Sequence, residues 1–332
     1  MKILEVATDA PPYKGGISRI VGILSGGLKQ RGHLVDVLTP KLRFREFKLS
    51  NIPFHQYNDY DVIHLHGPTP FLSDLMFMTN FKSPIVYTHH AEICWISEKL
   101  SRIYRDLHYF LSKKARITIV HSYDYARLFR RANVAVVRYP CPFDPPENFN
   151  IEGKTNPFTV LYVGQFRPFK GIDVLIKAAM ILKDIVFILA GEGYLKPKLM
   201  HMAKGLVNVK FFRRVDDEEL RELYKQGHVI CLPSVNTTEA YGLVLIEGAL
   251  HGCVPLASNL IGVRENISQL RGLLFEPKSC TSLVEKIRMI SADRALWVNL
   301  ARGSQRAAVN YVSTCTPDYY VDKHEEIFKK CL

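Results

Sequence analysis

The sequence predicts an α/β protein with two Rossmann-like, doubly wound domains that face a cleft. Continuous apolar, β-branched runs alternate with helix-period segments through most of the 332 residues, a pattern typical of parallel strands covered on both faces. Residues 139–155, rich in Pro, Asn and Gly, interrupt this alternation as a linker would. A chain of this length is also expected to form about two domains.

The expected strands of the first half are short and strongly apolar. They lie at residues 3–7, 34–38, 62–65, 85–88, 117–120 and 134–137. Helical patterns separate several of them, at residues 17–30, 71–79, 95–113 and 123–131. We therefore expect residues 1–150 to form the first domain.

The second half repeats the same alternation. Its expected strands lie at residues 159–163, 186–190, 209–212, 229–232, 255–257 and 272–275. A helix is expected over 216–226, because Asp216 and Asp217 suit a helix N-terminus. Helices over 282–291, 293–311 and 317–330 end the chain. We expect 151–316 to form the second domain, and a ligand to bind in the cleft between the domains, beyond the carboxyl ends of their strands.

The charge and cysteine content narrow the class of protein. Lys and Arg number 44 against 32 Asp and Glu, a net charge of +12 that favours phosphates, nucleic acid or an anionic membrane as partners. No nucleic-acid-binding motif accompanies this charge. Seven scattered Cys without a C-x-x-C pair argue against a zinc ribbon or disulfide framework and fit a reducing compartment. The opening residues do not have the pattern of a signal peptide, and a cytoplasmic location is expected.

Two candidate segments follow strands of the first domain. Gly15 and Gly16, in a loop after the first strand, would let backbone N–H groups approach a phosphate or sugar near a helix start, although an ordinary turn would also explain them. His89, His90 and Glu92 follow the strand at 85–88 and suggest a polar contact to substrate. Structural histidines are one alternative. Another is a metal site that the nearby His64 and His66 would complete if the two loops meet.

Two further segments follow strands of the second domain. Arg167 and Lys170 place cations beside a helix that starts near Gly171, which indicates a diphosphate site, with a solvated basic turn as the alternative. Gly191 and Gly193 would form a wall for a nucleotide base.

The segment 234–249 carries two carboxylates in different settings. Glu239 stands in a polar loop, and Gly242 then opens a helix that is apolar on nearly every side. Glu247 lies in that helix and needs a partner, because buried carboxylates are rare unless paired. A ribose diol would provide two O–H donors, and a salt bridge to a neighbouring Lys or Arg is the alternative.

These segments, in this order, resemble the retaining GT-B glycosyltransferases of family 4. The resemblance covers nearly the whole chain, and its most specific part is the E-x7-E motif from Glu239 to Glu247, together with Lys170-Gly171 and the glycine pair. It implies that His90, Glu239 and Lys170 are catalytic and that the 317–330 helix crosses back to the first, acceptor-side domain. The donor-binding residues that it implies are Gly15, Gly16, Gln165, Arg167, Lys170, Gly191, Gly193, Tyr241, Gly242, Leu243 and Glu247.

The chain departs from the family pattern at three places. Gln165 stands where many members have Arg, and Arg167 is the candidate replacement for that charge. One glycine of a common pair is absent before Glu265, and Glu92 stands where Asp is frequent. These departures leave the donor open.

The resemblance implies a retaining, metal-independent transfer of a hexose from a nucleotide-diphosphate sugar, GDP-mannose or a UDP-hexose, to a saccharide or lipid-linked saccharide. No cofactor and no metal are expected. A nucleotide-sugar 2-epimerase of the same architecture and a non-catalytic sugar-binding protein are the alternatives. The basic and apolar segments 41–45 and 99–116 predict contact with an anionic membrane at its cytoplasmic face, unless they are solvated faces of ordinary elements.

Overall fold

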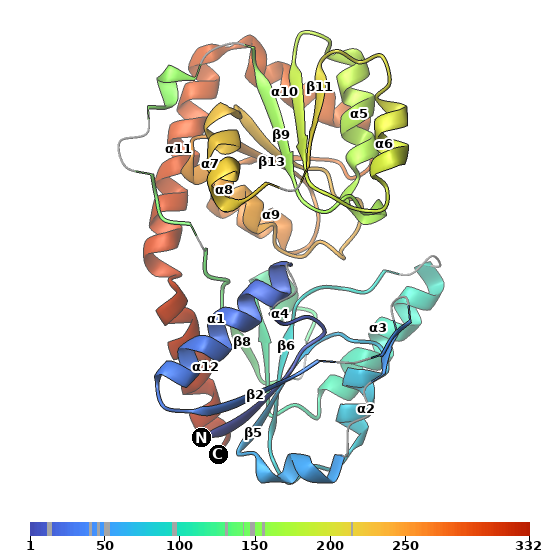
Figure 1. Cartoon of the computed structure of the whole chain (residues 1–332), viewed down its shortest axis with the longest axis vertical. Helices are drawn as coiled ribbons and strands as arrows, with labels where there is room; N and C mark the ends of the chain where they lie inside the picture. The colour runs from blue at the N-terminus through green and yellow to red at the C-terminus, as the bar shows by residue number, and fades with distance from the viewer. Residues whose placement is uncertain are drawn as a thin grey trace. The chain divides into compact units, whose positions relative to one another are not determined.

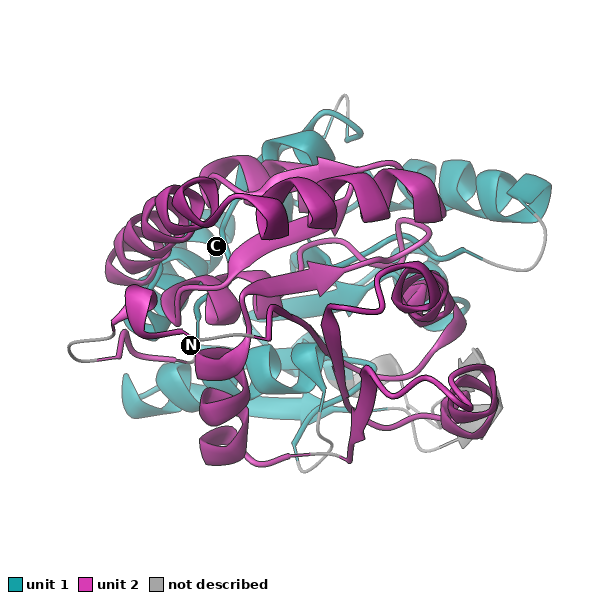
Figure 2. Ribbon diagram, turned by 90° about the horizontal axis from the view of Figure 1, so that it is seen from above, with its two compact units in different colours: residues 1–142, 315–332 teal, residues 143–314 magenta. Residues whose placement is uncertain are grey.

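The computed structural model describes residues 1–11, 15–39, 42–44, 47–49, 54–94, 98–129, 132–141, 143–146, 150–154, 157–213 and 215–332. The chain divides into two compact units, drawn in separate colours in Figure 2. Unit 1 comprises residues 1–142 and 315–332, and unit 2 comprises residues 143–314. Each unit contains one six-stranded sheet.

Unit 1 is built on a parallel sheet with the strand order β2-β1-β5-β6-β7-β8. The strands β5 and β6 are buried along their whole length, which places helices on both faces of the sheet. Most of its elements are labelled in Figure 1. They are β1 (Lys2–Val6), α1 (Gly16–Gln30), β2 (Leu34–Leu38), β5 (Val62–Gly67), α2 (Leu72–Met78), β6 (Ile85–His89), α3 (Glu98–Ser112), β7 (Ile117–Val120), α4 (Tyr123–Ala126), β8 (Val134–Val136) and α12 (Pro317–Cys331). A small antiparallel hairpin, β3 (Leu42–Phe44) with β4 (Phe47–Leu49), and a 3₁₀ turn, η1 (Phe54–Asp59), lie between β2 and β5.

Unit 2 repeats this plan with the order β11-β10-β9-β12-β13-β14, again all parallel. Its core includes the fully buried strands β12 and β13 and the large side chain of Trp297. The elements are η2 (Ile151–Gly153), β9 (Thr159–Val163), η3 (Pro168–Lys170), α5 (Ile172–Ile181), β10 (Val186–Ala190), α6 (Lys196–Met202), β11 (Val209–Phe212), α7 (Asp217–Gln226), β12 (Val229–Leu232), α8 (Leu243–Leu250), β13 (Val254–Ser258), α9 (Val263–Gln269), β14 (Leu273–Phe275), α10 (Cys280–Ala292) and α11 (Arg294–Thr314).

Two all-parallel sheets in α/β units confirm the predicted fold class. In both units the first strand has later strands on either side, so the strand order reverses beside β1 and beside β9. Ligands of open α/β sheets bind at such switch points, next to the carboxyl ends of the strands. One predicted element is too long: the helix expected over 123–131 ends at Ala126, after which short turns bring Phe129 into the core.

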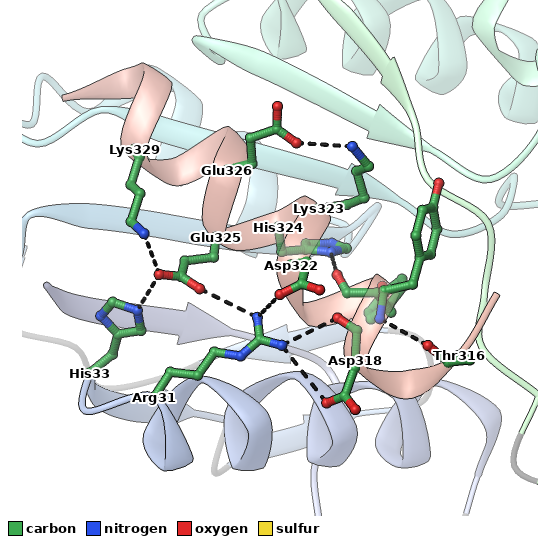
Figure 3. Close-up of polar contacts among 12 residues, drawn as sticks. Arg31, His33, Thr316, Asp318, Asp322, Lys323, His324, Glu325, Glu326 and Lys329 are labelled. Atoms are coloured by element: carbon green, nitrogen blue, oxygen red, sulfur yellow. Dashed lines mark hydrogen bonds and ion pairs between the residues drawn. The ribbon is translucent and has the colours of Figure 1, made fainter. Parts of the chain in front are cut away.

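The C-terminal helix α12 packs along α1 within unit 1. The two helices approach closely at Gly27, where an added Cβ would lie 2.5 Å from a methyl of Val321. Beyond this contact, Arg31 bonds Asp322 at 2.6 Å and Glu325 at 3.3 Å, and His33 Nε2 lies 3.1 Å from Glu325, as Figure 3 shows. Glu325 therefore joins α12 to the end of α1 and the turn that follows it.

Acid is expected to weaken this attachment. A hydrogen bond from Lys329 and another from His33 lower the pKa of Glu325 to about 2, below its usual value of 4.5. Because the folded pKa is depressed, the carboxylate stabilises unit 1 above pH 4.5, and this contribution is lost as the pH falls from 4.5 towards 2. Glu325→Gln should lower the urea midpoint at pH 6, and its difference from the parent should shrink towards pH 3.

Glu326→Gln is the matched control for this prediction. Glu326 lies next to Glu325 on α12, but its ion pairs with Lys323 and Lys330 join groups of the same helix. Its substitution should change the midpoint less, because exposed pairs within one helix contribute little to stability. Equal effects of both substitutions at pH 6 would contradict a specific role for Glu325.

Candidate functional site

Gly15 and Gly16 stand at the start of α1, after β1 at the switch point of unit 1. Both are exposed, and a Cβ added to either would have no atom within 4 Å among the described residues. Gly15 has an extended backbone that any residue could adopt. The open space beside the helix start, where the first N–H groups have no partner within the helix, is therefore the feature that suits a ligand. Residues 12–14 of this loop lie outside the described residues.

His90 follows β6 and is held by hydrogen bonds on both ring nitrogens. Its Nε2 lies 2.9 Å from Nδ1 of His66, and its Nδ1 is bonded to the hydroxyl of Tyr139. The backbone N–H of His90 also donates to the carbonyl of Gly67 at 2.7 Å. The ring is buried and stacks on that of His66. The predicted His90 is thus a rigidly oriented side chain near the carboxyl ends of β5 and β6.

Burial makes this histidine neutral. Loss of solvent, reinforced by the neighbouring rings of His66 and His121, holds the pKa of His90 well below its usual range. Burial also lowers the pKa of His121 to about 3. His90 can accept and donate hydrogen bonds at neutral pH, but it does not present a positive charge to a ligand.

The other polar residues of this loop point elsewhere. Nε2 of His89 lies 3.7 Å from Oε1 of Glu92, and Glu92 accepts a hydrogen bond from the Tyr109 hydroxyl on α3. Burial alone would raise the pKa of Glu92, but these two partners outweigh it and hold the pKa below its usual range. His89 and Glu92 therefore form a contact with α3, and His90 is the residue of the loop that joins the buried histidines.

In unit 2, Lys170 lies in the loop that follows β9 and is paired with Glu239. Its Nζ lies 2.5 Å from Oε2 of Glu239, and both side chains are largely buried. The turn depends on Gly171, which has a φ of +64° and whose added Cβ would fall 2.0 Å from the carbonyl of Pro233. The backbone after β9 thus packs directly on the backbone after β12, which brings Lys170 to Glu239.

Gln165 and Arg167, from the same loop, are exposed. The carbonyl of Gln165 accepts a hydrogen bond from the hydroxyl of Tyr162 at 2.9 Å, which fixes the loop backbone. Gly191 and Gly193 lie against this loop, since the N–H of Phe166 donates to the carbonyl of Glu192 at 2.8 Å. The three predicted donor-binding loops of unit 2 therefore meet around the ends of β9, β10 and β12.

Glu239 is positioned by its own short loop. The side chain of Asn236 accepts the N–H of Thr238 at 3.1 Å and closes a turn, while the Ser234 hydroxyl donates to Glu239 at 3.4 Å. Ser234 and Asn236 were not among the predicted site residues. Their role in orienting Glu239 depends on hydrogen-bond geometry that residue spacing does not reveal.

Gly242 caps the N-terminus of α8 with a φ of +78°, and Leu243 is the first helical residue. Glu247 lies one turn further on, only 5% exposed, and its Oε2 accepts a hydrogen bond of 2.7 Å from the Tyr224 hydroxyl on α7. Tyr224 is a partner that sequence reasoning missed. The hydroxyl donates one hydrogen bond and adds no charge, so it fixes the position of the carboxylate without neutralising it.

Tyr241, another of the predicted donor-binding residues, has its side chain engaged within unit 2. Its hydroxyl is hydrogen bonded to that of Tyr311 on α11, and its ring is buried. A contact between Tyr241 and the expected nucleotide-sugar donor would therefore involve the backbone of Tyr241. Asn266, also absent from the prediction, donates to the carbonyl of Tyr241 at 3.0 Å and holds the backbone that leads into α8.

Unit 2 thus presents a cation, two carboxylates and a helix N-terminus around neighbouring strand ends. The N–H groups of a helix start and a lysine ammonium are suited to phosphate oxygens. Carboxylates of low exposure suit hydroxyl groups, which donate without adding charge. The arrangement fits a ligand that has both anionic and polyhydroxylated parts.

Comparison with known proteins identifies a family whose model matches the part of the chain that carries these residues. Residues 144–307 match the family model described as glycosyl transferases group 1. The D-rhamnosyltransferase WbpZ of Pseudomonas aeruginosa is 30% identical over 78% of this chain and 72% of its own length. The O-antigen chain mannosyltransferase C of Escherichia coli is 24% identical over 100% of this chain and 99% of its own length.

A solved structure shows the same fold. Anabaena Alr3699/HepE, crystallised with UDP-glucose, superposes with a TM-score of 0.75 over 99% of this chain and 100% of its own, at 19% sequence identity. The family model lies entirely within unit 2. The Lys170–Glu239 pair and α8 are therefore parts of the segment that this family shares.

Proposed function

The chain belongs to the glycosyl transferases group 1 family, and on that basis we propose that it is a retaining, metal-independent hexosyltransferase using a nucleotide-diphosphate sugar. The observation that carries the proposal is the Lys170–Glu239 pair beside the start of α8, with Glu247 one turn along that helix. In this assignment Lys170 binds the diphosphate, Glu239 binds the sugar and Glu247 binds the ribose. In the same assignment Gly16 lies against the donor phosphate or sugar, and His90 contacts the transferred sugar.

The chemistry follows from the charges that develop during transfer. The bond from the anomeric carbon to the diphosphate oxygen breaks, its electron pair stays on the diphosphate, and positive charge grows on the sugar ring. Lys170, Arg167 and the N–H groups of α8 stabilise the growing negative charge. The acceptor hydroxyl attacks the anomeric carbon on the face that the leaving group vacates and transfers its proton to the departing phosphate. This sequence retains configuration and uses the chain's own cations for the leaving group.

The experiment that tests this function measures nucleotide release from a panel of UDP- and GDP-sugars. The names of the relatives favour mannose-like sugars, and the UDP-glucose of the structural neighbour adds UDP-hexoses to the panel. Each donor is incubated with saccharide and lipid-linked acceptors, with and without EDTA. We expect one donor to give acceptor-dependent release that EDTA leaves unchanged. Conversion of the donor sugar without acceptor would identify an epimerase instead, and loss of release in EDTA would contradict the metal-independent mechanism.

A stripe of apolar side chains on α3 supports our proposal of a lipid-linked acceptor. Leu100, Ile103, Leu107 and Phe110 recur at helical spacing, and each is more than half exposed. The opposite face of α3 is buried, at Tyr104, His108 and Ser112. The neighbouring helix α2, which packs against α3 in Figure 1, adds the exposed side chains of Leu75 and Met78.

Cations accompany this stripe. Lys99, Arg102, Lys113, Lys114 and Arg116 are exposed on α3 or just after it, and the ammonium of Lys113 lies 5.3 Å from the centre of the Phe110 ring. An apolar stripe with flanking cations is typical of a helix that lies on an anionic lipid surface. The described residues form no helix long and apolar enough to cross a membrane. The other predicted contact, residues 41–45, lies outside the residues whose side chains are described. Docking through α3 would give access to a lipid-linked acceptor.

Removing part of the stripe should release the protein from vesicles. Leu107→Ser with Phe110→Ser should reduce binding to phosphatidylglycerol-containing vesicles by about 10-fold or more, since each inserted side chain contributes roughly 1–3 kcal/mol. Flotation at low and high salt measures this, and binding should weaken with salt. Ile181→Ser with Val207→Ser, which also replaces two exposed apolar side chains, is the matched control. Equal flotation of all three proteins would contradict docking through α3.

A further inference from the structure

A continuous series of hydrogen bonds connects His90 to a buried carboxylate that has no assigned role. Nε2 of His66 lies 2.5 Å from Oε2 of Glu5, and Nδ1 of the same ring lies 2.9 Å from Nε2 of His90. The hydroxyl of Tyr139 then bonds Nδ1 of His90. Glu5, His66 and His90 lie on or directly after the adjacent strands β1, β5 and β6. Parallel pairing of these strands therefore sets the spacing of the series.

Glu5 also accepts hydrogen bonds from a second histidine, His64. Nδ1 of His64 lies 3.1 Å from Oε2 and 3.2 Å from Oε1 of Glu5, and Nε2 of His64 lies 2.7 Å from the hydroxyl of Thr88. Glu5 and His64 are 0% exposed, so bulk solvent does not screen these contacts. Burial alone would raise the pKa of Glu5, but His64 and His66 outweigh it and hold the pKa well below its usual range. Glu5 is therefore an ionised hydrogen-bond acceptor inside the unit.

The ionised state of Glu5 determines which nitrogen of His66 carries a hydrogen, and His66 in turn determines this for His90. An ionised carboxylate only accepts, so Nε2 of His66 must carry the hydrogen. Burial lowers the pKa of His66, and in a neutral ring the other nitrogen, Nδ1, then accepts. Nε2 of His90 must donate to it, which leaves Nδ1 of His90 as an acceptor for the hydroxyl of Tyr139. In every hydrogen bond of the series, the donor is the group further from Glu5 and the acceptor is the group nearer to it.

We infer that Glu5 and His66 are positioning residues that hold His90 in the tautomer with a hydrogen on Nε2 and an accepting lone pair on Nδ1. This inference rests on the proposed function, in which His90 contacts the transferred sugar. Nδ1 then selects a group that donates, and a sugar hydroxyl takes the place that Tyr139 fills in the structure. Groups that orient metal-ligating imidazoles contribute about 10- to 100-fold to metal affinity or activity, and we expect an effect of the same order for a group that orients His90.

The same residues have the ligand types of a metal site. Ligand atoms of Glu5, His64 and His66 lie within 4.8 Å of one another. The distances from Glu5 to the two histidines, 2.5 to 3.2 Å, are those of hydrogen bonds. The other ring nitrogen of each histidine is also engaged, with Thr88 for His64 and with His90 for His66. A metal ion would have to displace the hydrogens on which the series depends, so the two arrangements make different predictions.

The test begins with ¹⁵N NMR of the histidine-labelled full-length protein, which reports the tautomer of each ring without reference to activity. In the parent protein we expect His66 and His90 to be protonated at Nε2 alone and to remain so from pH 6 to 8. A His90 protonated at Nδ1, a cationic His90, or one equivalent of bound zinc in the purified protein would overturn the inference.

Two variants then locate what sets the tautomer. Glu5→Gln removes the charge at one end of the series, and Tyr139→Phe removes the hydroxyl at the other. We expect Glu5→Gln to mix the His90 tautomers and to lower kcat by about 10- to 100-fold, with the affinity for nucleoside diphosphate unchanged. Tyr139→Phe should leave the tautomer as it is. A change with Tyr139→Phe and none with Glu5→Gln would overturn the inference. Should Glu5→Gln not fold, the parent spectrum and Tyr139→Phe still decide it.

The proposed function can fail separately from this inference. An inactive parent protein with the expected tautomers would contradict hexosyl transfer and leave the positioning series intact. An active parent with a different His90 tautomer would do the reverse.

Discussion

Lys170→Ala is expected to abolish sugar transfer while the protein remains folded. In the proposed mechanism the ammonium of Lys170, which is paired with Glu239 in the loop before α8, stabilises the negative charge that the leaving diphosphate gains. Loss of one preorganised donor to such a charge typically lowers kcat by about 10²- to 10³-fold. The substitution also leaves Glu239 largely buried and without this partner. Repulsion between that carboxylate and the diphosphate should enlarge the loss towards the upper end of this range.

Lys170→Ala should also lower the free energy of unfolding modestly. Leaving a largely buried carboxylate without its ammonium costs roughly 1–3 kcal/mol, which a folded unit tolerates. Thermal unfolding followed by circular dichroism should therefore show a single shifted transition. Steady-state nucleotide release with the donor found in the screen gives kcat and KM separately.

Lys177→Ala is the matched control for Lys170→Ala. Lys177 lies on α5 in the same unit, and it is exposed with an ion pair to Asp173 at 3.3 Å. Both substitutions remove one positive charge, so they change the long-range potential similarly. Lys177→Ala should retain activity within about 3-fold of the parent, because exposed pairs contribute little. Near-parental kcat in Lys170→Ala would exclude Lys170 as the group that stabilises the diphosphate.

The fold was predictable because buried parallel strands have a simple sequence pattern. Strands such as β12 and β13 must be apolar on both faces, so they appear as continuous apolar runs. The helix α7 was predictable from Asp216, whose side chain accepts the N–H of Glu219 in a capping box. The end of α4 was not predictable, because Leu128 and Phe129 continue the helical spacing. After Ala126 the N–H groups of Leu128 and Phe129 donate to carbonyls three residues back, and Phe129 is buried by tertiary contacts that the local spacing does not reveal.

The candidate site was predictable only in part. Glu247 was found because a carboxylate in an apolar helix needs a partner, and the same reasoning applies to Glu5 in an apolar strand. Glu5, between Leu4 and Val6, was therefore also recognisable from the sequence as a carboxylate that needs a partner. The partners themselves, Tyr224 for Glu247 and His66 for Glu5, are separated from them by 23 and 61 positions. Only the folded sheets bring such pairs together.

Glu247→Gln is expected to weaken nucleotide binding with little change in kcat. The amide keeps the size of the side chain and an oxygen for the Tyr224 hydroxyl, but it loses the charge and one acceptor for the ribose diol. Hydrogen bonds to charged groups contribute about 1.5–3 kcal/mol, which corresponds to a Kd roughly 10- to 150-fold higher. In the proposed mechanism the ribose is held equally before and during transfer, so loss of its contact with Glu247 should appear in KM.

A pair of ligands makes this prediction specific to the ribose. The parent protein should bind the ribonucleoside diphosphate more tightly than its 2′-deoxy and 3′-deoxy analogues, and Glu247→Gln should lose most of that preference. Tyr224→Phe is the control, since it removes the hydroxyl partner and leaves the carboxylate in place. Calorimetric titration of the three proteins measures both quantities. If Glu247→Gln kept the full preference for the ribonucleotide, the carboxylate would have another role in unit 2. If only Glu247→Gln lost this preference, the charge of Glu247 would act on the ribose, which separates its role from that of Lys170 in the chemical step.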